Sequence, residues 1–136
     1  MLYRNFLWDF DGTLFDSYPH TMRCCWDALT DAGLAPSLDW EMTCRTILVS
    51  FAEMKRYTGM PDDVYAAFVA RAHLVGDAEV LPRAVPFPDA EAVLAAVVKQ
   101  GGRNYLYTHR NETARWYLET YGLADIQSAS VSAQEE

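Results

Sequence analysis

Two carboxylates separated by one residue follow an aromatic, branched run close to the N-terminus. Asp9 and Asp11 lie in the segment Trp8-Asp9-Phe10-Asp11-Gly12-Thr13-Leu14-Phe15-Asp16-Ser17. A carboxylate at the end of a strand can attack phosphorus and form an acyl phosphate that water later hydrolyses. A second carboxylate two residues on can protonate the departing alcohol and then activate that water. The segment therefore contains a candidate nucleophile and a candidate acid–base group.

The same segment also contains candidate ligands for a cation and for a phosphate. Two close carboxylates repel each other and favour a shared divalent cation, and oxygen-rich sites of this kind suit Mg²⁺ together with a substrate phosphate. Gly12 permits a sharp turn, and the backbone N–H groups beyond it, beginning at Thr13, can face phosphoryl oxygens. The alternative is an ordinary surface turn, because Asp-Gly is a common turn signal. The apolar run before it, and Thr108 at the end of a second apolar run, favour the site.

Hydrophobic spacing and turn residues predict the elements that would position these groups. Strands are expected at 3–10 and 105–108, with a weak one at 126–131, and a proline-rich connector at 76–88. Helices are expected over 19–32, from Ser37 to Gly59, from Pro61 to about residue 75, from Asp89 to Gly101-Gly102, and from Asn111 to Gly122.

A strand, a wholly helical block, and a return to alternating helix and strand predict an α/β fold. We expect a Rossmann-like parallel-sheet core, incomplete as written, at 1–16 and 84–136, with an inserted α-helical domain at 17–83. Ligands of open parallel sheets bind at the carboxyl ends of the strands. Asp9, Asp11 and Thr108 are expected at that edge.

The motifs resemble those of the haloacid dehalogenase (HAD) superfamily. Asp9-Phe10-Asp11-Gly12-Thr13 is similar to its first motif, and Tyr105-Leu106-Tyr107-Thr108 is similar to its second, an apolar strand ending in Ser or Thr. Phe15-Asp16-Ser17 and the helical block resemble the branch that includes phosphoglycolate phosphatases, in which a helical cap lies between these motifs. The resemblance covers essentially the whole chain.

The resemblance implies a Mg²⁺-dependent phosphatase of a small phosphorylated metabolite. In that interpretation Asp9 is the nucleophile, Asp11 is the general acid–base whose backbone carbonyl also binds Mg²⁺, and Thr108 binds the phosphate together with Gly12 and Thr13. His109 and Arg110 would place positive charge near the phosphate, although a solvated turn pair is an equal alternative. Asp16 and Tyr18, at the hinge into the cap, would contact the substrate. True dehalogenases of the superfamily lack the second acid, so Asp11 favours phosphate chemistry.

The chain also departs from the pattern of that superfamily. Its third motif is a Lys downstream of the Ser/Thr motif and its fourth is an acidic cluster, but no Lys follows Lys99 and the last acids, Glu135 and Glu136, lie in a polar tail. Lys99 and Lys55 match neither position. Two alternatives therefore stay open: a truncated or degenerate relative that acts as a binding or interaction module without catalysis, and a phosphosugar mutase.

Composition limits the partners of the chain. A formal net charge of -8 and a pI near 4.7 oppose extensive contact with nucleic acid or an anionic membrane. The three cysteines have spacings that match neither a zinc site nor a disulfide framework, which indicates reduced thiols. No segment could form a signal peptide or a membrane-spanning helix. A cytoplasmic protein is therefore expected. The missing strands predict an exposed apolar sheet edge, and with it association of copies as a homo-oligomer or aggregation. No pattern in the helical block identifies the substrate.

Overall fold

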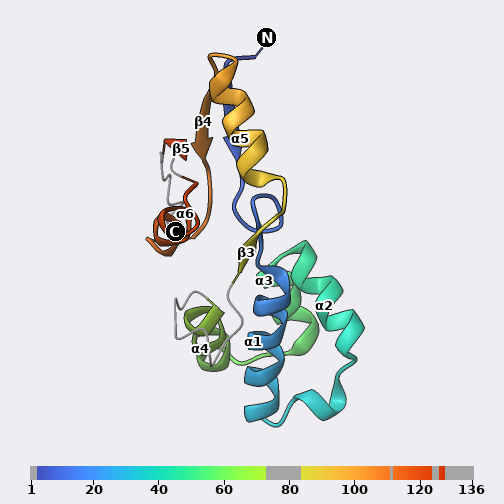
Figure 1. Cartoon of the computed structure of the whole chain (residues 1–136). Coiled ribbons are helices and arrows are strands. Elements are labelled where there is room, and N and C mark those ends of the chain that lie inside the picture. The colour runs from blue at the N-terminus through green and yellow to red at the C-terminus, as the bar shows by residue number, and fades with distance from the viewer. Residues whose placement is uncertain (1–2, 73–83, 111, 124–125, 128–136) are drawn as a thin grey trace. The chain divides into compact units, whose positions relative to one another are not determined.

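The computed structural model describes residues 3–72, 84–110, 112–123 and 126–127 of the 136-residue chain. The chain divides into two compact units (Figure 1). Unit 1 comprises Met1–Ser17 and Ala84–Glu136, and unit 2 comprises Tyr18–Arg83. No helix in the described part of the chain is long and apolar enough to cross a membrane.

Unit 1 contains a parallel sheet of three strands in the order β1-β4-β5. The strands are β1 (Asn5–Trp8), β4 (Arg103–Leu106) and β5 (Ile126–Gln127). β1 pairs with β4 from Asn5↔Arg103 to Trp8↔Leu106, so both strands end at the same edge. The mixed α/β class and the parallel pairing agree with the sequence-based expectation.

Two helices connect these strands. Helix α5 (Ala90–Lys99) precedes β4 and packs against it, and α6 (Thr113–Thr120) lies between β4 and β5. α5 ends before Gly101, whose φ of 78° suits glycine, as the sequence predicted. Asp89 precedes α5 as expected, but its side chain makes no capping hydrogen bond. Asn111, predicted to cap α6, lies outside the described residues, as do 128–131 of the predicted last strand.

One buried asparagine connects two strands of the sheet with helix α5. Asn104 is 1% exposed; its Oδ1 accepts from Trp8 Nε1 at 2.9 Å and its Nδ2 donates to the Leu94 carbonyl at 3.0 Å. One side chain thereby joins β1, β4 and α5. Leu7, whose side chain alternates with those of Phe6 and Trp8, is 70% exposed. Association of copies through an exposed sheet edge stays a prediction.

A second, two-stranded sheet lies next to the first motif. β2 (Phe15–Asp16) pairs antiparallel with β3 (Val85–Pro86). β3 falls within the segment that the sequence predicted as a plain connector, so that prediction is wrong at these two residues. A strand of two residues is compatible with proline because it has few ladder hydrogen bonds to lose.

Unit 2 contains four α-helices and a short 3₁₀ turn in its described part. They are α1 (Tyr18–Asp31), the turn Ala35–Ser37, α2 (Trp40–Val49), α3 (Phe51–Thr58) and α4 (Asp62–Ala72). Their shared core consists of small, aliphatic and sulfur-containing side chains around one phenylalanine: Cys24, Cys25, Leu29, Ala35, Ile47, Met54, Met60, Phe68 and Ala72.

The single helix predicted between Ser37 and Gly59 is in fact two helices. Asp39 begins α2, and its side chain accepts from the Met42 N–H at 2.7 Å. Ser50 has extended backbone (φ −172°, ψ 159°) and accepts from the Glu53 N–H at 3.0 Å, which starts α3. An extended residue cannot continue a helix, and its hydroxyl satisfies an N–H of the next one. Gly59 ends α3 in the left-handed region, as predicted.

Candidate active site

The carboxyl ends of β1 and β4 bring the two motifs together. Asp9 follows the last residue of β1, and Thr108 lies two residues beyond the end of β4. The Tyr107 N–H donates to the Trp8 carbonyl at 2.8 Å, which extends the pairing of the two segments past the last strand residue. β4 ends at Leu106, so the prediction that the strand reaches Thr108 is wrong by two residues. Both motifs nevertheless begin at the same edge of the sheet.

A tight turn holds the first motif. The Phe10 carbonyl accepts from the N–H groups of Leu14 and Phe15 at 3.2 and 3.0 Å, and the Gly12 N–H donates to the Phe15 carbonyl at 2.9 Å. Gly12 has φ 72°, a conformation that other L-residues rarely adopt. Thr13 is exposed on this turn. The predicted role of Gly12 as a turn residue agrees with this geometry, and phosphate binding by Gly12 and Thr13 stays a prediction.

Asp9 combines solvent contact with a perturbed carboxyl. Its Oδ1 accepts from the Phe10 N–H at 2.7 Å. Partial desolvation raises the pKa of the Asp9 carboxyl above its usual value and the Asp11 charge adds to this, whereas the Phe10 hydrogen bond and His109 oppose the rise. Acids with a shifted pKa are frequent in functional sites, and the two neighbours that act on the Asp9 carboxyl, Asp11 and His109, are both predicted site residues.

Asp11 is held by an arginine from the second motif. The Arg110 Nε lies 2.9 Å from Asp11 Oδ1 and 3.0 Å from Oδ2, and its Nη2 lies 2.8 Å from Oδ1. Ser17 Oγ also donates to Asp11 Oδ1. The sequence predicts Arg110 near a phosphate, but it does not predict the pairing of Arg110 with Asp11 or the contact of Ser17 with Asp11. The side chain of Arg110 is 3% exposed, so Arg110 is not part of a solvated turn pair.

The second motif divides into buried and exposed residues. Thr108 is 2% exposed, and its Oγ1 accepts from the Arg110 N–H at 3.1 Å, which leaves the hydroxyl proton to donate elsewhere. His109, between them, is exposed. The structure thus brings Asp9, Asp11, Thr108, His109 and Arg110 to one edge of unit 1.

The two remaining predicted residues lie elsewhere. Asp16 is exposed in β2 of unit 1, whereas Tyr18 begins α1 of unit 2. Their contact with a substrate stays a prediction.

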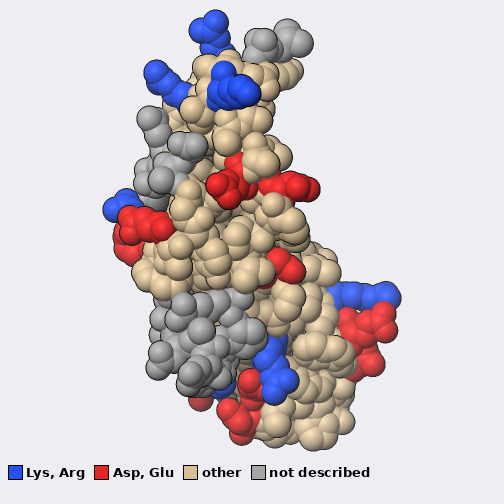
Figure 2. All heavy atoms as spheres, in the orientation of Figure 1, with Lys and Arg blue, Asp and Glu red and all other residues tan. Residues whose placement is uncertain are grey.

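Basic side chains gather at the other end of unit 1 (Figure 2). Arg4 precedes β1, Lys99 ends α5 and Arg103 begins β4, and all three are exposed. They therefore mark the amino ends of the strands, opposite the edge where Asp9 lies. Lys99 is consequently not positioned to replace the lysine of the third HAD motif, in agreement with the sequence analysis.

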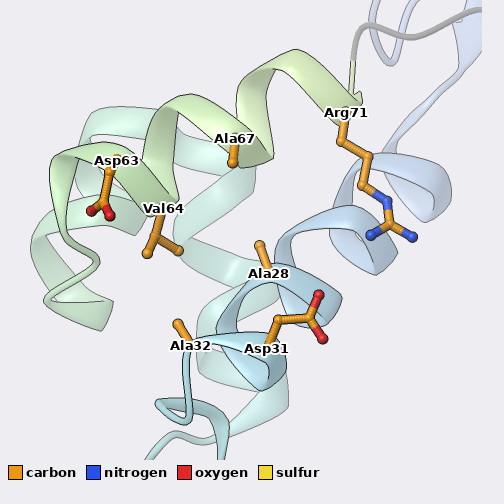
Figure 3. A pocket seen from close by; sticks show the side chains of 7 residues that line it. All are labelled: Ala28, Asp31, Ala32, Asp63, Val64, Ala67 and Arg71. Atoms are coloured by element: carbon orange, nitrogen blue, oxygen red, sulfur yellow. The ribbon is translucent and has the colours of Figure 1, made fainter.

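Unit 2 has a separate open pocket of about 310 Å³ between α1 and α4 (Figure 3). Small apolar side chains line it, with carboxylates and one arginine: Ala28, Asp31, Ala32, Asp63, Val64, Ala67 and Arg71. Arg71 Nη2 lies 3.6 Å from Asp27 Oδ2. Nothing in the sequence analysis pointed to this hollow.

No protein-family model matches the chain, and no curated protein matches it. Solved structures do match. A hydrolase from Streptococcus pneumoniae TIGR4 is 22% identical (TM-score 0.63; 100% of this chain and 71% of that chain covered). A predicted phosphoglycolate phosphatase from Haemophilus somnus 129PT is 17% identical (TM-score 0.73; 99% and 66%). A HAD-superfamily hydrolase, subfamily IA, variant 1, from Geobacter sulfurreducens PCA is 18% identical (TM-score 0.62; 98% and 65%).

The chain has the fold of the HAD-like hydrolases. This confirms the resemblance inferred from the two motifs. The chain spans about two thirds of the length of these solved structures, from 65% to 71%. At such low identity the HAD-like fold is shared, and the activity of this chain has to be argued from its own residues.

Proposed function

We propose that this chain is a HAD-type phosphatase that hydrolyses a small phosphorylated metabolite through an aspartyl phosphate on Asp9. One observation carries the proposal: the parallel pairing of β1 with β4 brings Asp9, Asp11 and Thr108 to one edge of the sheet, with Arg110 on Asp11. A nucleophile, an acid–base group and a hydroxyl that can bind a phosphoryl oxygen are groups that phosphate-ester hydrolysis can use.

The side chains divide the reaction into two steps. A carboxylate oxygen of Asp9 attacks phosphorus, the bond from phosphorus to the ester oxygen breaks, and Asp11 gives its proton to the departing alcohol. Asp11 then takes a proton from water as that water attacks the phosphorus, which releases inorganic phosphate and restores the Asp9 carboxylate. In both steps the hydroxyl of Thr108 donates a hydrogen bond to a phosphoryl oxygen and keeps its proton.

The donor chemistry of this edge fits Mg²⁺. Magnesium in phosphoryl-transfer sites is held by one or two carboxylates together with substrate phosphate and water. Asp9 has a carboxylate oxygen besides the one that accepts from Phe10, and Asp11 would contribute its backbone carbonyl because its side chain is engaged by Arg110. Among the described residues no group of three or more acidic, histidine or cysteine side chains forms a ready cluster. When bound, the cation would neutralise charge on the phosphoryl oxygens.

Unit 2 is proposed to act as the cap that selects the substrate. Its helices follow directly after the first motif in the chain, and a covering domain can exclude water from such a site. Asp16 and Tyr18, at the point where the chain passes between the units, are the residues proposed to contact the leaving group.

The test is hydrolysis of p-nitrophenyl phosphate by the purified chain with and without Mg²⁺. Asp9→Asn should reduce turnover to the level of a buffer blank, whereas Asp89→Asn, which neutralises an exposed carboxylate of the same unit, should retain it. Binding of Mg²⁺ by titration calorimetry should weaken in Asp9→Asn and persist in Asp89→Asn. A wild-type chain that binds phosphate without turnover would instead support the non-catalytic alternative. Transfer of the phosphoryl group to an added sugar phosphate would support a mutase.

A further inference from the structure

Arg110 contacts the Asp11 carboxylate asymmetrically. Its Nε and Nη2 both lie within 2.9 Å of Oδ1, whereas only Nε approaches Oδ2, at 3.0 Å. Ser17 adds a third donor to Oδ1. Among the described residues Oδ1 thus accepts from three donor atoms and Oδ2 from one. Oδ2 is therefore the oxygen with lone pairs left to exchange a proton.

The guanidinium also lies against two aromatic rings. Its Cζ lies 4.8 Å from the centre of the Phe10 ring and 5.9 Å from that of Tyr117. Phe10 and Tyr117 are 0% and 2% exposed, so these rings belong to the core of unit 1. The backbone N–H of Arg110 donates to Thr108 Oγ1 at 3.1 Å, which holds the main chain at the base of this side chain. A planar, stacked fork of this kind cannot be reproduced by lysine, whose ammonium is a flexible point charge.

From these contacts we propose that Arg110 is a positioning residue: it holds Asp11 by Oδ1, together with Ser17, so that Oδ2 carries the proton of the reaction. This inference rests on the proposed phosphatase function. It differs from the direct phosphate contact that the sequence predicted for Arg110, because the guanidinium acts on the substrate only through Asp11.

The two roles predict different dependence on the leaving group. An alkoxide needs a proton as it departs, whereas p-nitrophenolate leaves without one, so loss of Asp11 positioning harms alkyl phosphates selectively. Loss of a direct phosphate contact would harm both esters equally. The ratio kcat/KM reports the steps up to alcohol release, which excludes the later attack of water on the aspartyl phosphate.

The experiment compares kcat/KM for glycerol phosphate and p-nitrophenyl phosphate in wild type, Arg110→Lys, Ser17→Ala and the exposed control Arg103→Lys. For Arg110→Lys we expect a loss of about 10- to 100-fold on the alkyl ester and less than about threefold on the aryl ester. Ser17→Ala should give the same selectivity without disturbing the stacking of Arg110. In an Asp11→Asn background, Arg110→Lys should cause no further loss on either ester.

Equal losses on both esters, or losses that multiply with that of Asp11→Asn, would overturn the positioning role while the phosphatase function stands. A wild-type chain inactive on both esters would overturn the two together. A separate readout needs no activity: the Arg110 Nε–H should exchange with solvent more slowly than that of Arg103 by NMR, and Asp11→Asn should remove this protection. Equal exchange in wild type would show that the pair does not form.

Discussion

The two units of this chain bury polar groups in different ways. In unit 2 the buried hydroxyls of Thr43, Thr46 and Thr58 bond to carbonyls three or four residues earlier in their own segments. In unit 1, Trp8 bonds to Asn104 across 96 positions and Asp11 to Arg110 across 99. Bonds of the first kind stay within one helix or reach only to the residue just before it. Distant bonds of the second kind decide which side chains meet, and the proposed site depends on them.

The largest loss of stability should come from truncating a large side chain in the core of unit 2. Phe68 is 0% exposed and packs against the rings of Phe51 and Tyr65 at 5.2 and 6.2 Å. Phe68→Ala should lower the free energy of unfolding by about 3–5 kcal/mol, because it removes apolar contacts and leaves a cavity. Urea unfolding of Phe68→Ala beside Phe68→Leu measures this. If the stability comes from apolar packing, Phe68→Leu should retain most of the free energy of unfolding that Phe68→Ala loses. An equally large loss in the two variants would contradict this explanation.

The second effect concerns the distant polar link in unit 1. Asn104→Leu retains the approximate volume of the side chain but leaves the Trp8 indole N–H and the Leu94 carbonyl without their asparagine partner. We expect a loss of about 1–3 kcal/mol for leaving such groups unsatisfied. Asn5→Leu, at an exposed position of β1, is the matched control and should change stability little. A loss no larger in Asn104→Leu than in Asn5→Leu would remove the contrast drawn between the two units.

The same contrast explains what the sequence could and could not predict. The helix over 19–32 and the helix stop at Gly59 follow from local spacing and local caps, and the structure confirms them within one residue. The two motifs were recognisable because each is a short string next to an apolar run. The pairing of Arg110 with Asp11 could not be recognised in the same way, because nothing near residue 110 in the sequence indicates that Asp11 lies beside it.

The sequence does carry one local signal of the division between α2 and α3. Ser50-Phe51-Ala52-Glu53 has the serine and glutamate spacing typical of a helix start, although one continuous helix was predicted from Ser37 to Gly59. The structure begins α3 at this point. The limits of β4 and the pairing of β3 were missed for a different reason, because both depend on neighbouring strands rather than on their own residues.

A smaller effect should follow from removing that cap. Ser50→Ala deletes the oxygen that accepts from the Glu53 N–H, and we expect a loss of about 1 kcal/mol. Ser50→Gly should cost only a few tenths of a kcal/mol, because glycine exposes the N–H to water and adopts the extended backbone readily. Thermal and urea unfolding of both variants measure the difference. Equal stability of Ser50→Ala and wild type would mean that α2 and α3 are divided by packing and not by the cap.

The smallest loss of stability at neutral pH is expected from the core thiols of unit 2. This loss grows as the pH becomes alkaline. Burial raises the pKa of Cys25 to about 12 from an ordinary value of 9.0, and the neighbouring Cys44 and Cys24 add to the rise. Below pH 9 the thiol is neutral in both the folded and the unfolded chain, so the stability that its burial contributes is fully present. Between pH 9 and about 12 only the unfolded chain ionises, which draws the equilibrium towards unfolding. Stability should therefore fall by about 1 kcal/mol between pH 8 and 10 through this thiol alone.

Cys25→Val, which has no thiol to ionise, should lose less stability over the same interval, and the difference between the two slopes isolates Cys25 from the other titrating groups. Cys44→Val is the matched control, because Cys44 is only partly buried and should shift the slope less. Thiol labelling provides a second measure: in the folded wild type at pH 8, Cys25 should react far more slowly than Cys44, since the reactive thiolate is scarce and the sulfur is enclosed. Equal labelling of the two would mean that the core of unit 2 opens to solvent, and the contrast between local polar bonds in unit 2 and distant ones in unit 1 would then rest on unit 1 alone.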